Sequence, residues 1–317
     1  MPSARVLACP ASLKGVLSAR EAASALAEGL RTWADVDELP VADGGEGTLE
    51  VLHAALGGEW REAEVHDAFG RPRTARWLWH GGYAFVEAAE AIPLDPARLD
   101  AMSASSRGLG ELIASLVNPI LLFVFLGGTA NVDGGAGLQE VLTELPAPTV
   151  VICDVDVPLV DAARVFARQK GATDDQVREL EQRLLGMGEL KEMADLPGAG
   201  AAGGLGAAFA ALGAALYPTA EPVLLLVGFD PSGYDLVVTG EGTVDASTAL
   251  GKAPGEVARR CHAAGVRCVV FGGRVVEPVE GVETVALSGD PSRASEDLVE
   301  LGLRLRPGDE ALDRLRP

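Results

Sequence analysis

Short apolar runs rich in β-branched residues alternate with alanine-rich amphipathic stretches along the first 60 residues. A helix is predicted from Ser18, because Ser18 and Glu21 have the spacing of a capping box and apolar residues then recur near one helical face. Strands are expected at 5–9 and 36–41, and a second helix at 48–56. This strand–helix–strand–helix order is typical of a parallel α/β sheet.

The middle of the chain is less regular. Residues 74–80 and 83–89 flank Gly81-Gly82 and predict a β-hairpin. The short apolar run 223–227 fits a strand or a helix. The other elements expected here are a helix at 108–116, a strand at 120–126, a helix ending at 145, a strand at 149–154, a helix from 173 to about 185 and a tightly packed helix within 198–216.

The C-terminal part returns to the α/β pattern. A helix at 254–264 is marked by Pro254 in its first turn and Gly265 at its end. The other expected elements are strands at 235–239, 267–271 and 282–287, a loop at 240–242 and a helix at 295–303. Similar architecture at both ends predicts one discontinuous α/β domain, residues 1–64 and 235–317, with a second α/β domain, 65–234, inserted into it.

Composition narrows the class of protein. The 317 residues are 48% hydrophobic and 23% charged, which is the balance of a globular chain. The formal net charge of −20 argues against binding to nucleic acid or to an anionic membrane surface. The longest apolar stretch, 112–126, is interrupted by polar residues and is shorter than the ~20 residues of a membrane span. Four cysteines without a Cys-x-x-Cys pair, and the lack of a secretory signal, predict reduced thiols in the cytoplasm.

Four acidic segments, three of them rich in glycine, follow predicted strands, at 43–47, 131–135, 154–156 and 240–245. Glycine lets backbone N–H groups approach an anion, whereas carboxylates beside a phosphate make sense if Mg²⁺ lies between them. Ligands of open α/β sheets bind beyond the carboxyl ends of the strands. The segments therefore favour phosphoryl transfer, with ordinary turns as the alternative.

The few lysines point the same way. Only four of the 26 basic residues are lysines, and three of these, Lys14, Lys170 and Lys252, each adjoin a glycine. In a chain that uses arginine so predominantly, we would expect arginine at these positions if they were ordinary surface residues. Standard nucleotide motifs are lacking: Gly251-Lys252 is not part of a P-loop, and the Gly-x-Gly-x-x-Gly at 198–203 does not follow a strand and indicates close packing. Glu87, on an apolar strand, fits a sheet edge or a site equally well.

Taken together, these segments resemble the bacterial glycerate kinase family. The matches follow the family's order over nearly the whole chain, at 10–15, 17–21, 42–48, 108–113, 127–137, 153–155, 169–172, 198–206, 235–245 and 251–254. The resemblance implies two α/β domains, a flavodoxin-like one built from both chain ends and an inserted middle one, with the site between them. It also implies phosphorylation of D-glycerate by Mg-ATP, usually at the 2-hydroxyl to give 2-phosphoglycerate. A homodimer is left open.

The resemblance also carries site residues over to this chain. By the resemblance, Lys14 would contact phosphate. As a hypothesis about the mechanism, Asp43 or Asp133 would hold or deprotonate the acceptor hydroxyl. Because arginine suits bidentate pairing with a carboxylate, Arg71 would meet the substrate carboxylate unless it is a solvated loop residue. The implied catalytic residues are Lys14, Asp43, Asp133 and Asp245, and the implied metal ligands are Asp43, Asp133 and Glu241. The implied substrate- and phosphate-binding residues are Ser12, Gly44, Gly45, Glu46, Arg71, Gly128, Gly134, Glu241 and Lys252.

Several polar positions of the family are changed here. Ala11 stands for an Asp and Val132 for an Asn, while Val157 and Thr243 replace an Asn and an Arg. Two interpretations follow: a working kinase with altered substrate contacts, or a paralogue that binds another small hydroxy acid without phosphoryl transfer. Because phosphoryl transfer depends on positioning and electrostatics, the retained lysines and acids favour the kinase.

Overall fold

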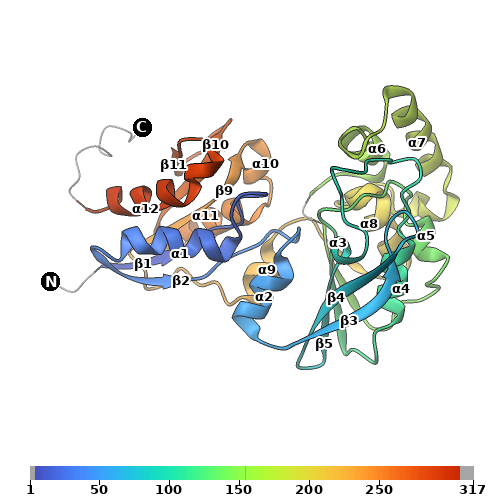
Figure 1. The fold of residues 1–317 in the computed structure, drawn as a ribbon, viewed down its shortest axis with the longest axis horizontal. Coiled ribbons are helices and arrows are strands. Elements are labelled where there is room, and N and C mark those ends of the chain that lie inside the picture. Colours follow the sequence, from blue (N-terminus) through green and yellow to red (C-terminus); the bar gives the residue numbers. More distant parts are fainter. Residues whose placement is uncertain (1–3, 154, 308–317) are drawn as a thin grey trace. The chain divides into compact units, whose positions relative to one another are not determined.

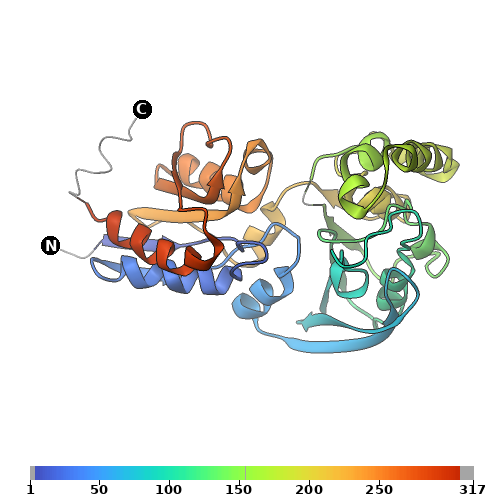
Figure 2. The ribbon, with the colours of Figure 1, turned by 45° about the horizontal axis from the view of Figure 1, so that its top comes forward.

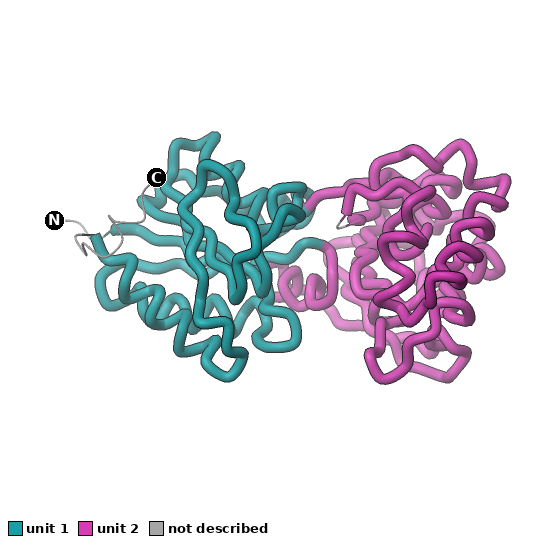
Figure 3. The backbone as a smooth tube through the Cα atoms, turned by 90° about the horizontal axis from the view of Figure 1, so that it is seen from above, with its two compact units in different colours: residues 1–43, 220–317 teal, residues 44–219 magenta. Residues whose placement is uncertain are grey.

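The computed structural model describes residues 4–153 and 155–307, which form two compact units (Figures 1 and 3). Unit 1 combines the N-terminal residues up to Asp43 with the residues from Ala220 onward, and unit 2 spans Gly44–Thr219. Each unit has its own sheet and its own apolar core. The predicted fold class, a discontinuous α/β domain interrupted by a second one, is confirmed.

Unit 1 is built on a five-stranded parallel sheet with the order β11-β10-β9-β1-β2. Numbered within the unit, this is the 2-1-3-4-5 order of flavodoxin-like folds. The strands are β1 (Ala4–Ala8), β2 (Ala34–Glu38), β9 (Leu236–Val244), β10 (Arg267–Val275) and β11 (Glu283–Ala286).

Helices cover both faces of this sheet, as the alternation of side chains along β10 shows. Val269 and Phe271 pack in the core with α1 (Ala19–Leu30) and α12 (Ala294–Arg304), which lie side by side (Figure 2). Val270 packs on the other side with Ala258 of α11 (Ala253–Ala264). Two short helices, α9 (Glu221–Leu226) and α10 (Ala246–Ala249), pack against α11, and a 3-10 turn (Pro291–Arg293) precedes α12.

Unit 2 contains a mixed six-stranded sheet with the order β3-β4-β5-β6-β7-β8. The first three strands are antiparallel and the last four are parallel, so the predicted hairpin at Gly81-Gly82 is confirmed. The strands are β3 (Glu59–His66), β4 (Pro72–His80), β5 (Tyr83–Glu87), β6 (Leu121–Phe125), β7 (Thr149–Ile152) and β8 (Ala215–Tyr217).

The helices of unit 2 surround this sheet and a second apolar cluster. The cluster gathers α6, α7 and α8 around Leu180, Leu184 and Ala208. The helices are α2 (Thr48–Leu56), α3 (Ala88–Ala91), α4 (Arg107–Ala114), α5 (Ala136–Gln139), α6 (Ala162–Phe166), α7 (Asp174–Gly186) and α8 (Ala201–Ala211), with 3-10 turns at Leu159–Asp161, Arg168–Lys170 and Gly188–Met193.

Local end signals were the most reliable guides to the helices. The capping boxes predicted at Ser18 and Thr173 are both formed, with Glu21 and Gln176 as their partners. Gly265 ends α11 in the left-handed conformation, at a φ of 69°. Within the described residues no helix is long and apolar enough to cross a membrane, and all four cysteines are free thiols.

Several predicted elements are corrected. The helix after the glycine-rich loop covers only Ala136–Gln139 and does not continue to Leu145, and the strand expected at 36–41 lies earlier, at Ala34–Glu38. The run 223–227 belongs to a helix, α9. Strand β3 was not predicted, because it is an edge strand with mostly polar, half-exposed side chains and lacks the apolar alternation of a buried strand.

Two further predicted elements were wrong at segments that contain glycines. The expected loop at 240–242 is part of β9, where a Cβ on Gly240 would lie 2.3 Å from the Phe271 carbonyl oxygen of β10. The helix expected within 198–216 begins only at Ala201, has left-handed residues at 202–204, and is followed by β8. Close packing of its glycines is confirmed, since a Cβ on Gly203 would lie 2.4 Å from the Asn131 carbonyl oxygen.

The boundaries between the two units lie earlier in the chain than the expected ones, which were at 64/65 and 234/235. Helix α2 packs on β4 and β5 and therefore belongs to unit 2. Helix α9 packs on α11 and therefore belongs to unit 1. The change-over points are Asp43/Gly44 and Thr219/Ala220.

Candidate functional site

The strand order of unit 1 creates a switch point between β1 and β9. The chain leaves β1 toward α1 on one face of the sheet and leaves β9 toward α11 on the other. In open α/β sheets the crevice at such a point, beyond the carboxyl ends of the strands, is where ligands bind. Six predicted site residues lie on the segments that follow β1 and β2 or on β9 and the segment after it; we call them the carboxyl-edge cluster: Ser12, Lys14, Asp43, Glu241, Asp245 and Lys252.

The segment after β1 forms a tight turn that presents Lys14. The Ala11 N–H donates to the Gly240 carbonyl at 2.9 Å, and Leu13 and Leu17 pair across the turn. Lys14 is exposed between them. A Cβ on Gly242 would lie 3.5 Å from the Lys14 backbone nitrogen, so this turn packs directly beside β9.

Glu241 is the most buried acid of the cluster, with 9% of its surface exposed. Its carboxylate accepts a hydrogen bond from the Thr248 hydroxyl at 2.7 Å and lies 3.4 Å from the Lys252 ammonium. Burial raises the pKa of Glu241, and the negative charge of Asp43 raises it further, whereas Lys252 and Thr248 oppose the rise.

Asp245 is tied into the same cluster through Thr248. Its carboxylate caps α10 by accepting the Ser247 N–H at 2.9 Å and the Ser247 hydroxyl, and these bonds lower the pKa of Asp245. The fully buried Thr248 hydroxyl accepts the Asp245 N–H and donates to Glu241. Sequence reasoning missed Thr248, although the Asp-x-x-Thr spacing of a helix cap was available to find it.

The other predicted site residues belong to unit 2. The Gly127 N–H donates to the Gly44 carbonyl at 3.2 Å, and a Cβ on Gly128 would lie 3.8 Å from the Glu46 Cβ. The Gly45 carbonyl accepts the Thr48 hydroxyl at the start of α2. The segment 44–47 and the glycine-rich loop after β6 therefore lie side by side.

Asp133 is the centre of that glycine-rich loop. Its carboxylate accepts five hydrogen bonds, from the Ser106 N–H and hydroxyl, the Asn131 amide, and the N–H groups of Gly135 and Gly137. A carboxylate offers about four lone-pair sites, so Asp133 is saturated by its own unit. The Gly134 N–H is also bonded, to the Gly203 carbonyl. This loop is thus held by internal hydrogen bonds.

Two buried ionisable groups, Lys170 and Glu87, support the unit 2 loops. The Lys170 ammonium, on a side chain only 4% exposed, donates to the Asn131 carbonyl at 2.7 Å. Glu87 accepts the Leu49 N–H at 2.7 Å in the first turn of α2, and burial raises the pKa of Glu87 to about 8. Strand β5 lies between β4 and β6, so the alternative that Glu87 marks a sheet edge is wrong.

Arg71 lies in the turn that joins β3 to β4. Asp67 organises this turn by accepting the N–H groups of Phe69 and Arg71 at 2.8 and 2.9 Å. Arg71 itself is exposed, and its charge contributes to the lowered pKa of Asp67. A role for Arg71 toward substrate stays a prediction.

No group of three His, Cys, Asp or Glu side chains within 4–153 and 155–307 forms a ready metal site. Mg²⁺ does not require one, because it is commonly held by one or two carboxylates together with substrate phosphates. Asp43 and Glu241, which share unit 1 and interact electrostatically, fit that requirement.

The fold and this site define an α/β protein with a flavodoxin-like unit that carries carboxylates and lysines at its switch point. Comparison with known proteins is specific: the model of the glycerate kinase family matches residues 6–145 and 143–290. The chain belongs to the glycerate kinase family. The two matched segments overlap at residues 143–145 and together reach from residue 6 to residue 290.

Individual relatives agree. The chain is 35% identical to the glycerate 2-kinase of Escherichia coli K12, over 81% of this chain and 83% of the relative. It is 33% identical to the glycerate kinase of Halalkalibacterium halodurans, over 87% of each chain. A crystal structure from Salmonella typhimurium LT2, assigned provisionally as glycerate kinase 2, superposes with a TM-score of 0.79 at 29% identity and covers 98% of this chain and 100% of its own. Family membership supports kinase chemistry and the use of ATP.

Proposed function

We propose that this protein transfers the γ-phosphoryl group of ATP to the 2-hydroxyl of D-glycerate and forms 2-phosphoglycerate. The observation that carries the proposal is the carboxyl-edge cluster at the switch point of unit 1, where two lysines and three acids lie on β9 or on segments that follow β1, β2 and β9, and where Lys252 pairs with Glu241. Phosphoryl transfer needs little covalent chemistry from the protein and rests on positioned charges of this kind. A reducing, cytoplasmic location stays an expectation from the sequence.

The two lysines are proposed to bind phosphate oxygens. Lys14 is exposed on its turn, and Lys252 is half-buried at the start of α11. The 3.4 Å separation between Lys252 and Glu241 is long for a charged hydrogen bond, so the ammonium keeps donors for a ligand. Glu241 and Thr248 would then fix the direction of the Lys252 side chain.

Asp43 is proposed to hold the acceptor hydroxyl and to take its proton. Asp133, the alternative, already accepts five hydrogen bonds within unit 2 and has no lone pair to spare. We therefore assign Asp133 to the positioning of the glycine-rich loop. The segment that follows Asp43 is anchored by its contacts with residues 127 and 128.

Asp43 and Glu241 are the proposed ligands of Mg²⁺, with carboxylate oxygens of the type this ion prefers. When bound, Mg²⁺ would neutralise the charge that develops on the transferring phosphoryl group. Asp245 is already engaged in capping α10, so we propose that it fixes the 245–248 turn.

The test is ADP release from Mg-ATP by the purified protein, with and without D-glycerate, in wild type and in Asp43→Asn. We expect glycerate-dependent turnover that falls about 10²–10⁴-fold in the variant, which is the usual contribution of a positioned general base. Asp35→Asn, an exposed aspartate on β2, is the matched control and should keep wild-type turnover. The ³¹P spectrum of the product distinguishes the 2-phosphate from the 3-phosphate. Equal turnover in both variants would remove Asp43 from the mechanism.

A second candidate, another small hydroxy acid as acceptor or ligand, is favoured by two buried positions. Ala11 and Val132 are 7% and 1% exposed and stand where the family resemblance expects polar side chains. Sites that lack a hydrogen-bonding partner for a substrate group discriminate differently among acceptors. Turnover without D-glycerate preference in a panel of 2-hydroxy acids would support this alternative, and binding of one of them without ADP release would identify a non-catalytic paralogue.

A further inference from the structure

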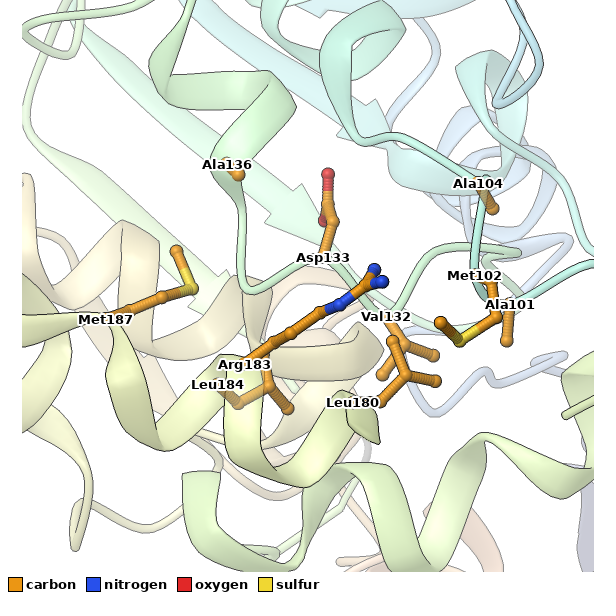
Figure 4. A pocket seen from close by; sticks show the side chains of 10 residues that line it. All are labelled: Ala101, Met102, Ala104, Val132, Asp133, Ala136, Leu180, Arg183, Leu184 and Met187. Carbon is orange, nitrogen blue, oxygen red and sulfur yellow. The ribbon is translucent and has the colours of Figure 1, made fainter. Parts of the chain in front are cut away.

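Unit 2 contains a cavity of about 260 Å³ that the proposed chemistry does not use. One wall is α7, which contributes Arg183, and the other walls are the 101–104 segment and the glycine-rich loop (Figure 4). Apart from Arg183 and Asp133, the lining side chains are apolar: Ala101, Met102, Ala104, Val132, Ala136, Leu180, Leu184 and Met187.

The chemistry of this lining excludes a small polar acid as its occupant. D-glycerate has three carbons, each bearing oxygen, and offers no apolar surface to bury against methionine, leucine and alanine. The Asp133 carboxylate is already saturated, and the N–H groups of residues 134–137 are all bonded within the unit. Residues 134–137 therefore offer the cavity no free backbone donor for an anion.

The same lining suits a flat aromatic ring. Thioether sulfurs make favourable contacts with aromatic rings, and the planar guanidinium of arginine stacks on them. Met102 and Met187 approach from opposite sides of the cavity, and the Arg183 guanidinium reaches in between them, below Asp133 (Figure 4). Alanines at three lining positions leave the space open.

The size agrees with a fused two-ring base. An apolar cavity of about 150 Å³ is known to accept benzene, a single six-membered ring. The cavity here is larger, at about 260 Å³. We propose that this cavity of unit 2 binds the adenine base of ATP, with Arg183 and the two methionines against the faces of the ring. This inference rests on the proposed use of ATP and adds the place where the base is held.

The test fills the cavity from its rim. Ala136 is exposed and lines the cavity, so Ala136→Phe puts a ring into it without disturbing the core. Ala114→Phe, at an exposed alanine of α4, is the matched control. Equilibrium binding is measured for ATP and for inorganic tripolyphosphate, which has the phosphates without the base. We expect the Kd of ATP to rise at least tenfold in Ala136→Phe while that of tripolyphosphate changes less than twofold, with neither changed in the control.

Arg183→Gln separates stacking from phosphate binding. Arg183 is half-exposed and pairs only with Glu179 among the ion pairs recorded for the described residues, so its loss leaves the core intact. A weaker Kd for ATP with unchanged tripolyphosphate binding supports the base site, whereas equal weakening of both would overturn it in favour of a phosphate site. Unchanged ATP binding in Ala136→Phe would overturn the inference and leave the kinase proposal standing. If ATP binds through this cavity but no glycerate-dependent turnover occurs, the base site stands and the kinase proposal is overturned. If the wild-type protein binds no ATP, both the base site and the kinase proposal are overturned.

Discussion

Glu87 is a carboxylate placed where ionisation is costly. Only 3% of its surface is exposed, and its partner is a backbone N–H at the start of α2. Burial is the main cause of its pKa of about 8, and the negative charges of Glu50 and Glu90 add to it. Because Glu87 joins β5 to the first turn of α2 within unit 2, its protonation state bears on the stability of that unit.

The sign of the resulting pH dependence follows from proton linkage. In the unfolded chain Glu87 loses its proton near pH 4.3, whereas in the folded chain it keeps it until about pH 8. Between these values the folded state binds more protons, so its stability is greatest below the lower value and falls as the pH rises through the window. The slope from this group is at most about 1.4 kcal/mol per pH unit.

Glu87→Gln should remove this slope. The amide keeps an oxygen for the Leu49 N–H and carries no charge, so we expect the variant to lose less stability than wild type between pH 5 and 8 and to be the more stable protein at pH 8.5. Urea unfolding followed by tryptophan fluorescence at a series of pH values measures both. Glu28→Gln, at an exposed glutamate of α1, should retain the wild-type slope. Identical slopes in all three proteins would contradict a protonated Glu87.

At the scale of elements, the contact between α1 and α12 depends on two glycines. A Cβ on Gly302 would lie 2.7 Å from the Leu26 carbonyl oxygen, and one on Gly29 would lie 2.1 Å from the Val299 carbonyl oxygen. The Gly302 carbonyl also accepts the indole N–H of Trp33 at 2.8 Å. The two helices therefore pack backbone to backbone, and neither glycine is there for a turn.

Gly302→Ala should destabilise unit 1 because the added methyl group forces α12 away from α1. Overpacking of this kind costs about 1–3 kcal/mol, more than the ~1 kcal/mol that alanine gains in helix propensity. Gly186→Ala is the matched substitution, since Gly186 ends α7 with open space around it and should be neutral or stabilising. Thermal unfolding should show a lower Tm for Gly302→Ala and an unchanged or higher Tm for Gly186→Ala, and a Gly302→Ala variant as stable as wild type would refute the packing argument.

The elements also show where sequence reasoning succeeds. Capping boxes and glycine stops are local signals, so the starts of α1 and α7 and the end of α11 were predicted correctly. Gly240 was assigned to a loop because glycine is common there, but its role is close contact with Phe271, which lies on another strand 31 residues further along the chain. Such a requirement comes from a distant segment and leaves no local pattern.

For the molecule as a whole, the alternation of strands and helices at both ends was enough to predict the discontinuous α/β architecture. The site could be predicted only in part. Lys14, Asp43, Glu241 and Lys252 were predicted from residue type and flanking glycines. They lie on β9 or on segments that follow strands of one sheet, and their roles stay predictions. The saturation of Asp133 depends on Ser106, and no spacing in the sequence reveals that pair.

Unit 2 is continuous in sequence and has a sheet and core of its own, which predicts that residues 44–219 fold without the rest of the chain. The fragment with the boundaries expected from sequence, 65–234, lacks α2 and nearly all of β3. It would leave Glu87 buried without its Leu49 partner and would expose the surface that Leu49 and Leu52 cover, both of which are fully buried.

We therefore expect residues 44–219 to unfold cooperatively in urea, with the fluorescence of Trp60, Trp77 and Trp79 as the probe, and residues 65–234 to be unfolded or aggregated. The difference would arise because a buried carboxyl group that loses its hydrogen-bond partner and an uncovered apolar surface both cost free energy. Size-exclusion chromatography separates the folded from the aggregated fragment. If the 65–234 fragment unfolds cooperatively and the 44–219 fragment does not, α2 contributes its stability to unit 1 and not to unit 2. The boundary near residue 64 would then be restored.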